Sequence, residues 1–239
     1  MQKQILYTDL ARYYDLIYSW KDYKKEAAII RGLIARHKRS KGNDLLEVAC
    51  GTGRHIQYLK DKFRVLGTDI SAGMLRVARQ KVKGARFQRA DMVTLNLGRE
   101  FDVITCLFSS IGYVKTSADL KWTLQNFGRH LKKGGVVIIE PWLTKEMVKE
   151  GHPHMTTYAD DDIKVARLNV SKVRGNISIL DMHYLVAEKG KTVKHFVDRH
   201  ELRMSEPQQI LEFMRQGGLR AKFIRNGLMK GRGLYIGVK

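Results

Sequence analysis

The sequence predicts an α/β fold built on a mostly parallel sheet, and three observations lead to this class. Apolar segments of strand length alternate with amphipathic segments of helical length from residue 44 to residue 140. A glycine-rich turn, Gly51-Thr52-Gly53, follows the first of these strands. Acidic residues end the second and third strands, Asp69 and Asp91, at the sheet edge where open α/β sheets bind their ligands. Together these features predict a Rossmann-like crevice for a nucleoside-bearing cofactor.

The elements of the sheet are marked by start and stop signals. An amphipathic helical stretch covers residues 8–37 and ends before a Lys-Gly-Asn turn at 41–43. Ser71 is a suitable N-cap for the helix that carries Met74. A basic last turn followed by Gly134-Gly135 predicts the end of a later helix. We expect strands at 44–49, 64–69, 85–90, 101–108 and 136–140, and helices at 53–60, from residue 71, and at 118–131.

The pattern changes after Pro141, because polar and apolar residues now alternate and turn-forming residues separate the segments. This predicts an inserted antiparallel β-meander, with strands at 154–160, 163–173, 176–188 and 193–204. A helix from near Ser205 to Gly217 follows, and two last strands at 221–225 and 233–238 would complete a seven-stranded sheet as an antiparallel pair. We therefore expect a core at 1–141, an inserted β subdomain at 142–204, and the closing elements of the core at 205–239.

The bulk composition narrows the class of protein. A chain of 239 residues suits one domain with an embedded subdomain. No apolar run approaches the roughly 18 to 20 residues of a membrane span, and no Cys or His cluster has metal-ligand spacing, so we expect neither a membrane nor a metal. Cys50 and Cys106 lie in apolar segments and suggest buried thiols in a reducing cytoplasm. The net charge of +20 is spread along the chain, which fits a solvated surface or attraction to nucleic acid.

The cofactor can be narrowed from the residues around the glycine turn. A dinucleotide site needs a third glycine so that a helix N-terminus can bind pyrophosphate, and His55 and Ile56 stand in its place. Glu47 precedes the turn, and a carboxylate there would repel a phosphate. The same charge favours the sulfonium and ammonium groups of S-adenosyl-L-methionine. Asp69 is placed to accept hydrogen bonds from the two hydroxyls of a ribose.

The run from Glu47 to Gly53 has the form E-x-x-C-G-x-G, which resembles motif I of the class I methyltransferases. Asp69 resembles their motif II acid. The resemblance implies S-adenosyl-L-methionine as the cofactor, on a Rossmann-like methyltransferase sheet. It also implies that Asp91 bonds the adenine amino group and that Met92 packs against the adenine ring.

Three further blocks are more specific: FSSIGY at 108–113, EPW at 140–142 and GRGL at 231–234. They resemble the sugar-nucleotide N,N-dimethyltransferases of desosamine and mycaminose biosynthesis, over nearly the whole chain. The resemblance implies a homodimer that transfers a methyl group directly, in line, to the amine of a nucleotide-linked amino sugar. One aromatic residue of the family's second block is replaced by Leu143. An RNA or protein methyltransferase that uses the basic surface is the alternative, whereas three intact acids argue against a non-catalytic cofactor-binding subunit.

The resemblance also assigns roles to single residues. Tyr113 faces the amine, and because an unperturbed tyrosine has a pKa of about 10 and is a poor base, we expect it mainly to orient the nucleophile. Arg232 is expected at the substrate diphosphate, where a planar guanidinium suits phosphate oxygens. The inserted strands would wall the sugar pocket and carry His200 in addition to the residues below. The expected cofactor-binding residues are Tyr14, Tyr23, Glu47, Ala49, Gly51, Gly53, Asp69, Ile70, Met74, Asp91, Met92 and Phe108. The expected substrate-binding residues are Ser109, Ser110, Tyr113, Trp142, His183, Tyr184 and Arg232.

Overall fold

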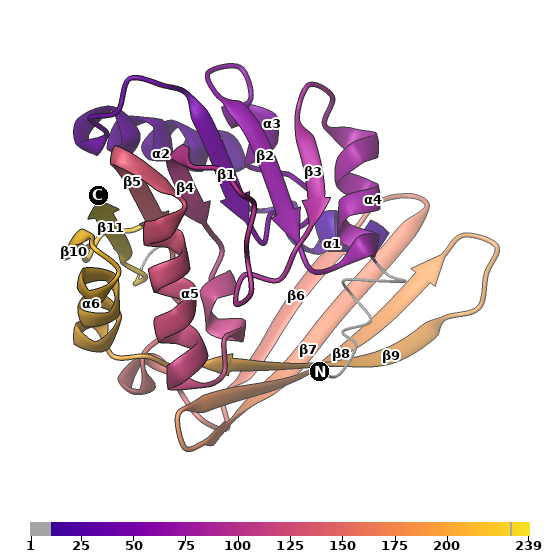
Figure 1. Ribbon diagram of the computed structural model, residues 1–239. Helices are drawn as coiled ribbons and strands as arrows, with labels where there is room; N and C mark the ends of the chain where they lie inside the picture. The colour runs from indigo at the N-terminus through magenta and orange to yellow at the C-terminus, as the bar shows by residue number, and fades with distance from the viewer. Residues whose placement is uncertain (1–10, 230) are drawn as a thin grey trace.

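The computed structural model describes residues 11–229 and 231–239 and shows two separate sheets (Figure 1). The large sheet has seven strands in the order β10-β11-β5-β4-β1-β2-β3, and the small sheet has four strands in the order β6-β7-β8-β9. The large sheet comprises β1 (Asp44–Val48), β2 (Arg64–Asp69), β3 (Arg86–Arg89), β4 (Phe101–Cys106), β5 (Leu131–Ile139), β10 (Arg220–Ile224) and β11 (Leu234–Val238). The small sheet comprises β6 (Pro153–Ala159), β7 (Ile163–Arg174), β8 (Ile177–Glu188) and β9 (Lys194–Arg203). The helices are α1 (Ala11–Ile17), α2 (Tyr23–His37), α3 (Ile56–Leu59), α4 (Ala72–Lys81), α5 (Ser117–Arg129) and α6 (Pro207–Gln216), with short 3-10 turns η2 (Ser110–Tyr113) and η3 (Lys145–Met147).

The connections of the large sheet create a crevice between β1 and β4. From β1 the chain adds β2 and β3 on one side, all parallel, and then crosses to β4 and β5 on the other side. The strand β11 runs antiparallel to both β5 and β10. Ligands bind at such a reversal of strand order, outside the carboxyl ends of the strands. The predicted seven-stranded α/β sheet with a closing antiparallel pair and an inserted antiparallel sheet is confirmed.

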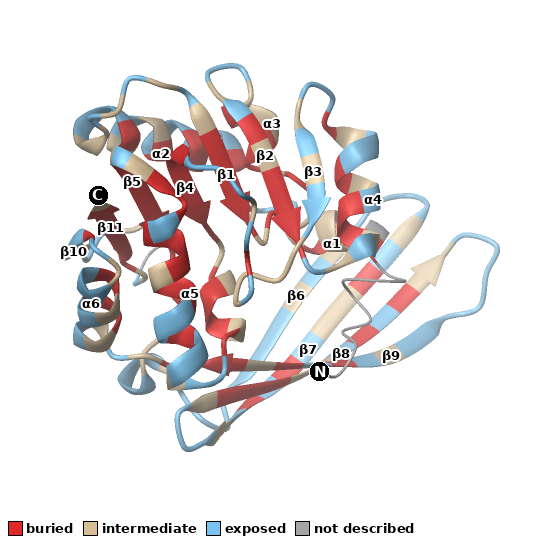
Figure 2. Cartoon of the chain, viewed as in Figure 1, coloured by how far each residue is buried: buried red, intermediate tan, exposed pale blue. Residues whose placement is uncertain are grey.

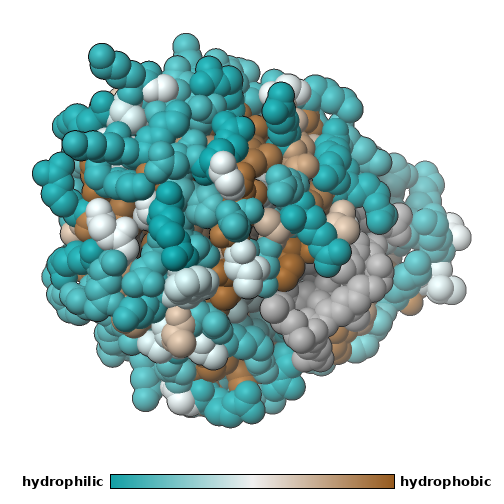
Figure 3. Space-filling model, in the orientation of Figure 1, coloured by the Kyte–Doolittle hydropathy of each residue, from teal (hydrophilic) through white to brown (hydrophobic). Residues whose placement is uncertain are grey.

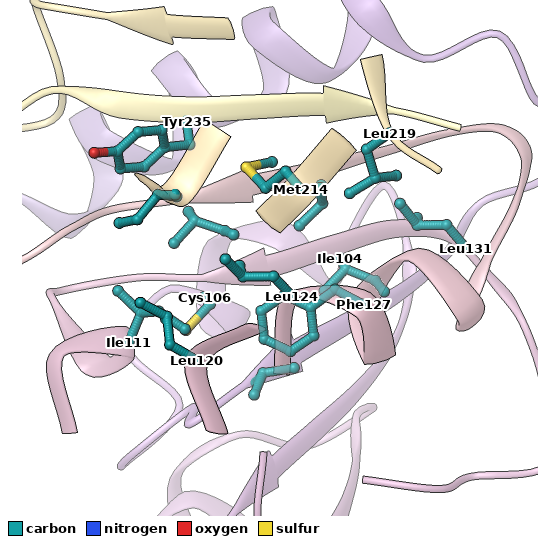
Figure 4. Close-up of a cluster of buried hydrophobic side chains, with 14 of the residues drawn as sticks. Ile104, Cys106, Ile111, Leu120, Leu124, Phe127, Leu131, Met214, Leu219 and Tyr235 are labelled. Carbon is teal, nitrogen blue, oxygen red and sulfur yellow. The ribbon is translucent and has the colours of Figure 1, made fainter. Parts of the chain in front are cut away.

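Helices cover both faces of the large sheet because consecutive strand residues point in opposite directions. Leu45 and Val103 face the layer of α2, α3 and α4, where they pack with Ile30. Leu46 and Ile104 face the layer of α5 and α6. Figure 4 shows this second layer, in which Leu124, Phe127 and Met214 from the two helices meet the sheet. The buried strands at the centre of Figure 2 are therefore enclosed from both sides.

The small sheet is attached to the core through α1. Tyr13 and Ile17 of α1 are buried against Val165, Tyr184 and Val186 of the meander. The meander lies beside the carboxyl ends of the core strands, as Figure 1 shows. Its inner face can therefore form a second wall of any site at the crevice.

Hydrophilic side chains cover most of the molecular face seen in Figure 3.

The predicted helical stretch at 8–37 is wrong in one respect, since it consists of two helices. Residues 8–10 lie outside the described residues. The chain turns between α1 and α2, and the Asp22 carboxylate caps α2 by accepting a hydrogen bond from the Lys25 amide at 2.9 Å. The amphipathic sequence pattern continues through the turn between α1 and α2, so the pattern alone did not indicate the N-cap at Asp22. Among the described helices, none is long and apolar enough to cross a membrane.

Two other boundaries differ from the prediction. The strand β5 begins at Leu131 and not near residue 136, so the basic and glycine-rich stretch belongs to the strand. Gly134 has a φ of +76° and donates its amide hydrogen to the Lys239 carbonyl oxygen at 2.8 Å. Its amide is therefore paired with the end of the chain and does not take part in ending a helix. The helix expected at 53–60 is only the single turn α3, because Gly51 and Gly53 hold left-handed conformations before it.

Two helical glycines form a matched test of the packing. A Cβ atom at Gly128 of α5 would collide with the carbonyl oxygen of Gly217 at the end of α6, whereas a Cβ atom at Gly32 of α2 would meet nothing within 4 Å. We expect Gly128→Ala to lower the free energy of unfolding by about 2 kcal/mol through overpacking. Gly32→Ala should raise it by up to about 1 kcal/mol through helix propensity. Urea denaturation measures both, and equal changes in the two variants would contradict the close approach of α5 and α6.

Candidate active site

The crevice is built on backbone turns that few residues adopt. Three non-glycine residues of the described ranges have a positive φ: Ala49 (54°), Phe108 (49°) and Ser109 (63°). Ala49 follows β1, and the other two follow β4, so all three lie at the reversal of strand order. Such conformations cost of the order of 1–3 kcal/mol each and persist where surrounding contacts impose them. The crevice is thus a place where the fold accepts local strain.

An acid from a neighbouring strand holds each turn. Asp69, at the end of β2, accepts hydrogen bonds from the amides of Gly51 and Ser71, both at 2.8 Å. Glu140, directly after β5, accepts one from the Phe108 amide at 2.7 Å. Burial raises the pKa of both carboxyl groups. The two acids therefore act in the same way, one on the β1 turn and one on the β4 turn.

The glycines of the first turn serve different purposes. At Gly51, φ is +55° and an added Cβ atom would meet nothing within 4 Å, so the conformation alone requires glycine and the space above it is open. At Gly53, a Cβ atom would lie 3.2 Å from Val82 and 3.5 Å from Phe87. Gly51 therefore leaves room for a ligand, whereas Gly53 lets the turn pack closely on α4 and β3.

A cavity of about 510 Å³ extends from this crevice to the inner face of the meander, a size typical of small-molecule sites. It brings together most of the residues expected from the sequence. Those that line it are Tyr14, Ala49, Gly51, Asp69, Ile70, Met74, Met92, Phe108, Ser109, Ser110, Tyr113, Trp142 and Arg232. The crevice and the meander thus share one cavity.

The other expected residues do not line the cavity. The Asp91 carboxylate accepts a hydrogen bond from the Val93 amide at 2.9 Å and so caps its own turn. Tyr23 is buried with its ring against His55. Tyr184 is buried on the inner face of β8, beyond the cavity wall. His183 points to the opposite, exposed face of β8 and stacks on the His195 ring at 5.5 Å. Their roles in binding stay predictions.

Glu47 belongs to a buried charged network below the crevice. The His55 ring lies between two acids, with Nε2 2.7 Å from a Glu26 oxygen and Nδ1 3.7 Å from a Glu47 oxygen. Lys21 forms an ion pair with Glu26. Burial opposes ionisation of Glu26, but the hydrogen bonds from His55 and Lys21 outweigh it and lower its pKa. Glu47 lacks such partners, so burial raises its pKa to about 7, and its Oε2 atom has no hydrogen-bond partner within the described residues.

A cationic group in the crevice would compensate this buried carboxylate, because a nearby positive charge favours the ionised form of an acid. The open space above Gly51, the Asp69 carboxylate and the buried Glu47, whose Oε2 atom has no hydrogen-bond partner within the described residues, therefore fit a ligand that carries a ribose and cationic groups. S-adenosyl-L-methionine has both.

Arg232 is anchored at the far side of the cavity. Its Nη1 atom donates to the Ser109 hydroxyl at 2.8 Å, and its guanidinium lies 4.9 Å from the Trp142 ring centroid. The Ser109 hydroxyl in turn donates to the Pro141 carbonyl oxygen at 2.7 Å. Ser109 thus positions Arg232, and its hydroxyl is engaged within the protein. Burial lowers the pKa of Arg232, while Glu140 opposes this change.

Several cavity residues were not expected from the sequence, among them Tyr18, Lys115 and Arg199. The Tyr18 hydroxyl accepts a hydrogen bond from Arg167 of β7 at 2.8 Å, which joins the turn after α1 to the meander. A signal for the inner face exists in β7, where Arg167, Asn169 and Ser171 place polar groups at alternate positions. These three residues line the cavity.

Comparison with known proteins agrees with this geometry. Residues 45–135 match the family model described as a methyltransferase domain. The chain is 36% identical over 233 residues to the dTDP-3-amino-3,4,6-trideoxy-alpha-D-glucopyranose N,N-dimethyltransferase of Streptomyces venezuelae, covering 96% of this chain and 98% of the relative. A Streptomyces fradiae relative, a dTDP-3-amino-3,6-dideoxy-alpha-D-glucopyranose N,N-dimethyltransferase, is also 36% identical, over 96% of this chain and 91% of its own length.

Solved structures show the same likeness. Streptomyces venezuelae DesVI superimposes with a TM-score of 0.90 at 35% identity, over 97% of this chain and 98% of that chain. The sugar N-methyltransferase KedS8 from Streptoalloteichus superimposes with a TM-score of 0.87 at 32% identity, over 95% of this chain and 92% of that chain.

The fold and the crevice thus define an S-adenosylmethionine-dependent methyltransferase. Within that class, the chain belongs to the family of sugar-nucleotide N,N-dimethyltransferases.

The buried Glu47 predicts an unusual pH dependence of stability. Its folded pKa of about 7 lies above the ordinary value of 4.5, so the folded state binds the proton more tightly and stability falls as the pH rises from 4.5 to 7. Glu47→Gln should remove this loss and stabilise the unliganded protein at pH 8 by up to about 3 kcal/mol, with little gain at pH 4.5. Urea denaturation at the two pH values measures the change, with the exposed Glu206→Gln as control. A gain that is the same at both pH values would contradict the assignment.

Proposed function

We propose that the protein methylates the amine of a nucleotide-linked amino sugar. The observation that carries this proposal is the single cavity that joins the Asp69 and Gly51 crevice to Tyr113 and Arg232. A methyl donor on one side and an anionic sugar nucleotide on the other can then meet within one enclosed space. The relatives named above, which match nearly the whole chain, support this substrate class over RNA or protein.

The cofactor side of the cavity suits S-adenosyl-L-methionine. When bound, this cofactor supplies a methyl group on a sulfonium, an electrophile that an amine can attack directly. Asp69 would accept hydrogen bonds from the ribose, and Met92 would pack on the adenine. Glu47 would lie below the cationic groups, where its charge becomes favourable. Gly51 would leave the space that the cofactor needs.

The substrate side is rich in positive charge. The cationic residues that line the cavity are Lys115, Lys149, Arg167, Arg199 and Arg232, against the acids Asp69 and Glu201. Glu201 already pairs with Lys115 at 2.5 Å and lies 3.6 Å from Arg199. Arg232 has a rigid planar guanidinium, a group that can donate two parallel hydrogen bonds to phosphate oxygens. Tyr113 would then orient the amine for attack.

We also propose that the protein is a homodimer and works in the cytoplasm. The outer face of the meander carries an apolar stripe on β7, β8 and β9, with His183 among its members: Leu168, Val170, Leu185 and Val197, each 40% to 47% exposed. Proteins that remain monomeric seldom leave such a surface uncovered, and a second copy of the same face covers it with two-fold symmetry. The two free cysteines, Cys50 and Cys106, suit a reducing compartment.

The function can be tested by mass spectrometry. Incubation with S-adenosyl-L-methionine and a dTDP-linked 3-amino-6-deoxy sugar should give one or two added methyl groups on the sugar. Asp69→Ala should lower the cofactor affinity measured by calorimetry by roughly 100-fold, because two hydrogen bonds to a charged group are lost. The exposed Asp61→Ala is the matched control. Methylation of RNA but not of the sugar nucleotide would overturn the proposal, as would unchanged affinity in Asp69→Ala.

The dimer is tested separately. Leu168→Lys places a charge at the centre of the apolar stripe, on the face turned away from the cavity. We expect the wild type to sediment as a dimer and the variant to dissociate at least about 10-fold more readily, since a buried unpaired charge is costly. Analytical ultracentrifugation measures this, with Lys172→Ala as a control at the exposed end of β7. A monomeric wild type would refute the proposed contact.

A further inference from the structure

A chain of polar contacts, one hydrogen bond and one ion-pair contact, leads away from Tyr113 into the meander. The Tyr113 hydroxyl lies 2.7 Å from Nδ1 of His200, and Nε2 of the same ring lies 3.1 Å from the Asp198 carboxylate. Tyr113 and His200 line the cavity. His200 and Asp198 are each only 2% exposed. These contacts therefore connect the cavity surface with Asp198, a buried acid two positions before His200 on β9.

The proton positions follow from the chemistry of the three groups. The Nε2 atom of His200 lies 3.1 Å from the Asp198 carboxylate, and a negative oxygen attracts an N–H group and repels a ring lone pair, so we assign the proton to Nε2. The Nδ1 atom of the neutral ring is then an acceptor, and the Tyr113 hydroxyl donates to it.

The arrangement is costly for a purely structural contact. Positions 196, 198, 200 and 202 of β9 share the inner face, and Phe196 and Leu202 are apolar, as packing would require. Asp198 and His200 place an acid and an imidazole on that buried face, where unpaired polar groups are strongly disfavoured. The ion-pair contact between them and the hydrogen bond between His200 and Tyr113 compensate this cost and orient the ring.

Other charged groups around the chain are already engaged. Tyr184 of β8 and Asp198 are close enough to interact electrostatically, and Tyr184 is hydrogen-bonded to Arg167 of β7. Arg167 also donates to the Tyr18 hydroxyl at 2.8 Å. On the η2 side, Lys115 pairs with Glu201 of β9, and Arg199 lies beside the same acid. Asp198 is thus the acid that directly faces the His200 ring among these groups.

We propose that Tyr113, His200 and Asp198 form a proton relay that deprotonates the substrate amine. The inference rests on the proposed function, because it takes an ammonium group in the cavity as the proton donor. The N–H bond of the ammonium breaks, its electron pair remains on nitrogen, and the proton passes to the Tyr113 oxygen as the phenol proton moves to Nδ1 of His200. The ring becomes an imidazolium that Asp198 stabilises, and the net charge is unchanged. Tyr113 never has to become a phenolate.

The relay makes a specific kinetic prediction. In His200→Gln, Tyr113 keeps a hydrogen-bond partner but the proton has no acceptor, so kcat near pH 7 should fall about 100-fold with KM changed less than about threefold. The deficit should shrink steadily as the pH rises, because water and hydroxide then deprotonate the amine. Tyr113→Phe should show a similar loss, and the double variant should lose no more than either single variant. His37→Gln, far from the cavity at the end of α2, is the control. The relay would be overturned if the deficit of His200→Gln were the same at every pH. It would also be overturned if the loss in the double variant equalled the product of the two single losses.

A second readout does not depend on activity. Nitrogen NMR of the His200 ring should show the proton on Nε2 in the wild type and its redistribution in Asp198→Asn, with cofactor affinity by calorimetry unchanged. A proton on Nδ1 in the wild type would contradict the relay even if the sugar is methylated. A wild-type protein with the expected tautomer that methylates no amino sugar would refute the proposed function and leave the arrangement of Tyr113, His200 and Asp198 intact.

Discussion

Two hydrogen bonds that backbone amides donate to strand-end acids hold the backbone on which the site depends. Asp69 extends from β2 to the turn after β1, and Glu140 extends from the end of β5 to the turn after β4. Both turns contain left-handed residues that would otherwise relax. Because β2 and β5 flank β1 and β4 in the sheet, the parallel topology supplies an acid on each side of the crevice. The backbone at Gly51 and at Phe108, on the two sides of the crevice, is therefore held by these two contacts.

The remaining parts of the site divide the chemistry between them. The core sheet provides a cofactor crevice with the buried Glu47 carboxylate below it, which a cationic ligand would stabilise. The meander provides the opposite wall, held to the core by α1 and by the bond from Arg167 to Tyr18. Arg232 and Tyr113 come from connecting segments between these walls. A small cationic donor and an anionic acceptor can therefore be held by different elements and meet in the middle.

The sequence predicted the parts that local pattern determines. The turn at Gly51, the N-cap at Ser71 and the meander strands follow from spacing within a few residues, and all three are present. Side-chain placement across strands was harder, because alternation shows that two faces exist but not which one is inner. For this reason the sequence did not reveal that His183 lies on the outer face of the meander and His200 on the inner face. The network of Glu26, His55 and Glu47 joins positions far apart in the chain, which spacing alone cannot reveal.

The central claim is that one cavity brings a cofactor at Asp69 and an amine at Tyr113 into line. A crystal structure with S-adenosylhomocysteine and a dTDP-linked amino sugar tests it most directly. The account predicts the ribose on the Asp69 carboxylate, the amine nitrogen within hydrogen-bond distance of the Tyr113 hydroxyl, and the diphosphate on Arg232. A sugar nucleotide bound outside the cavity, or with its amine turned away from Tyr113, would contradict it.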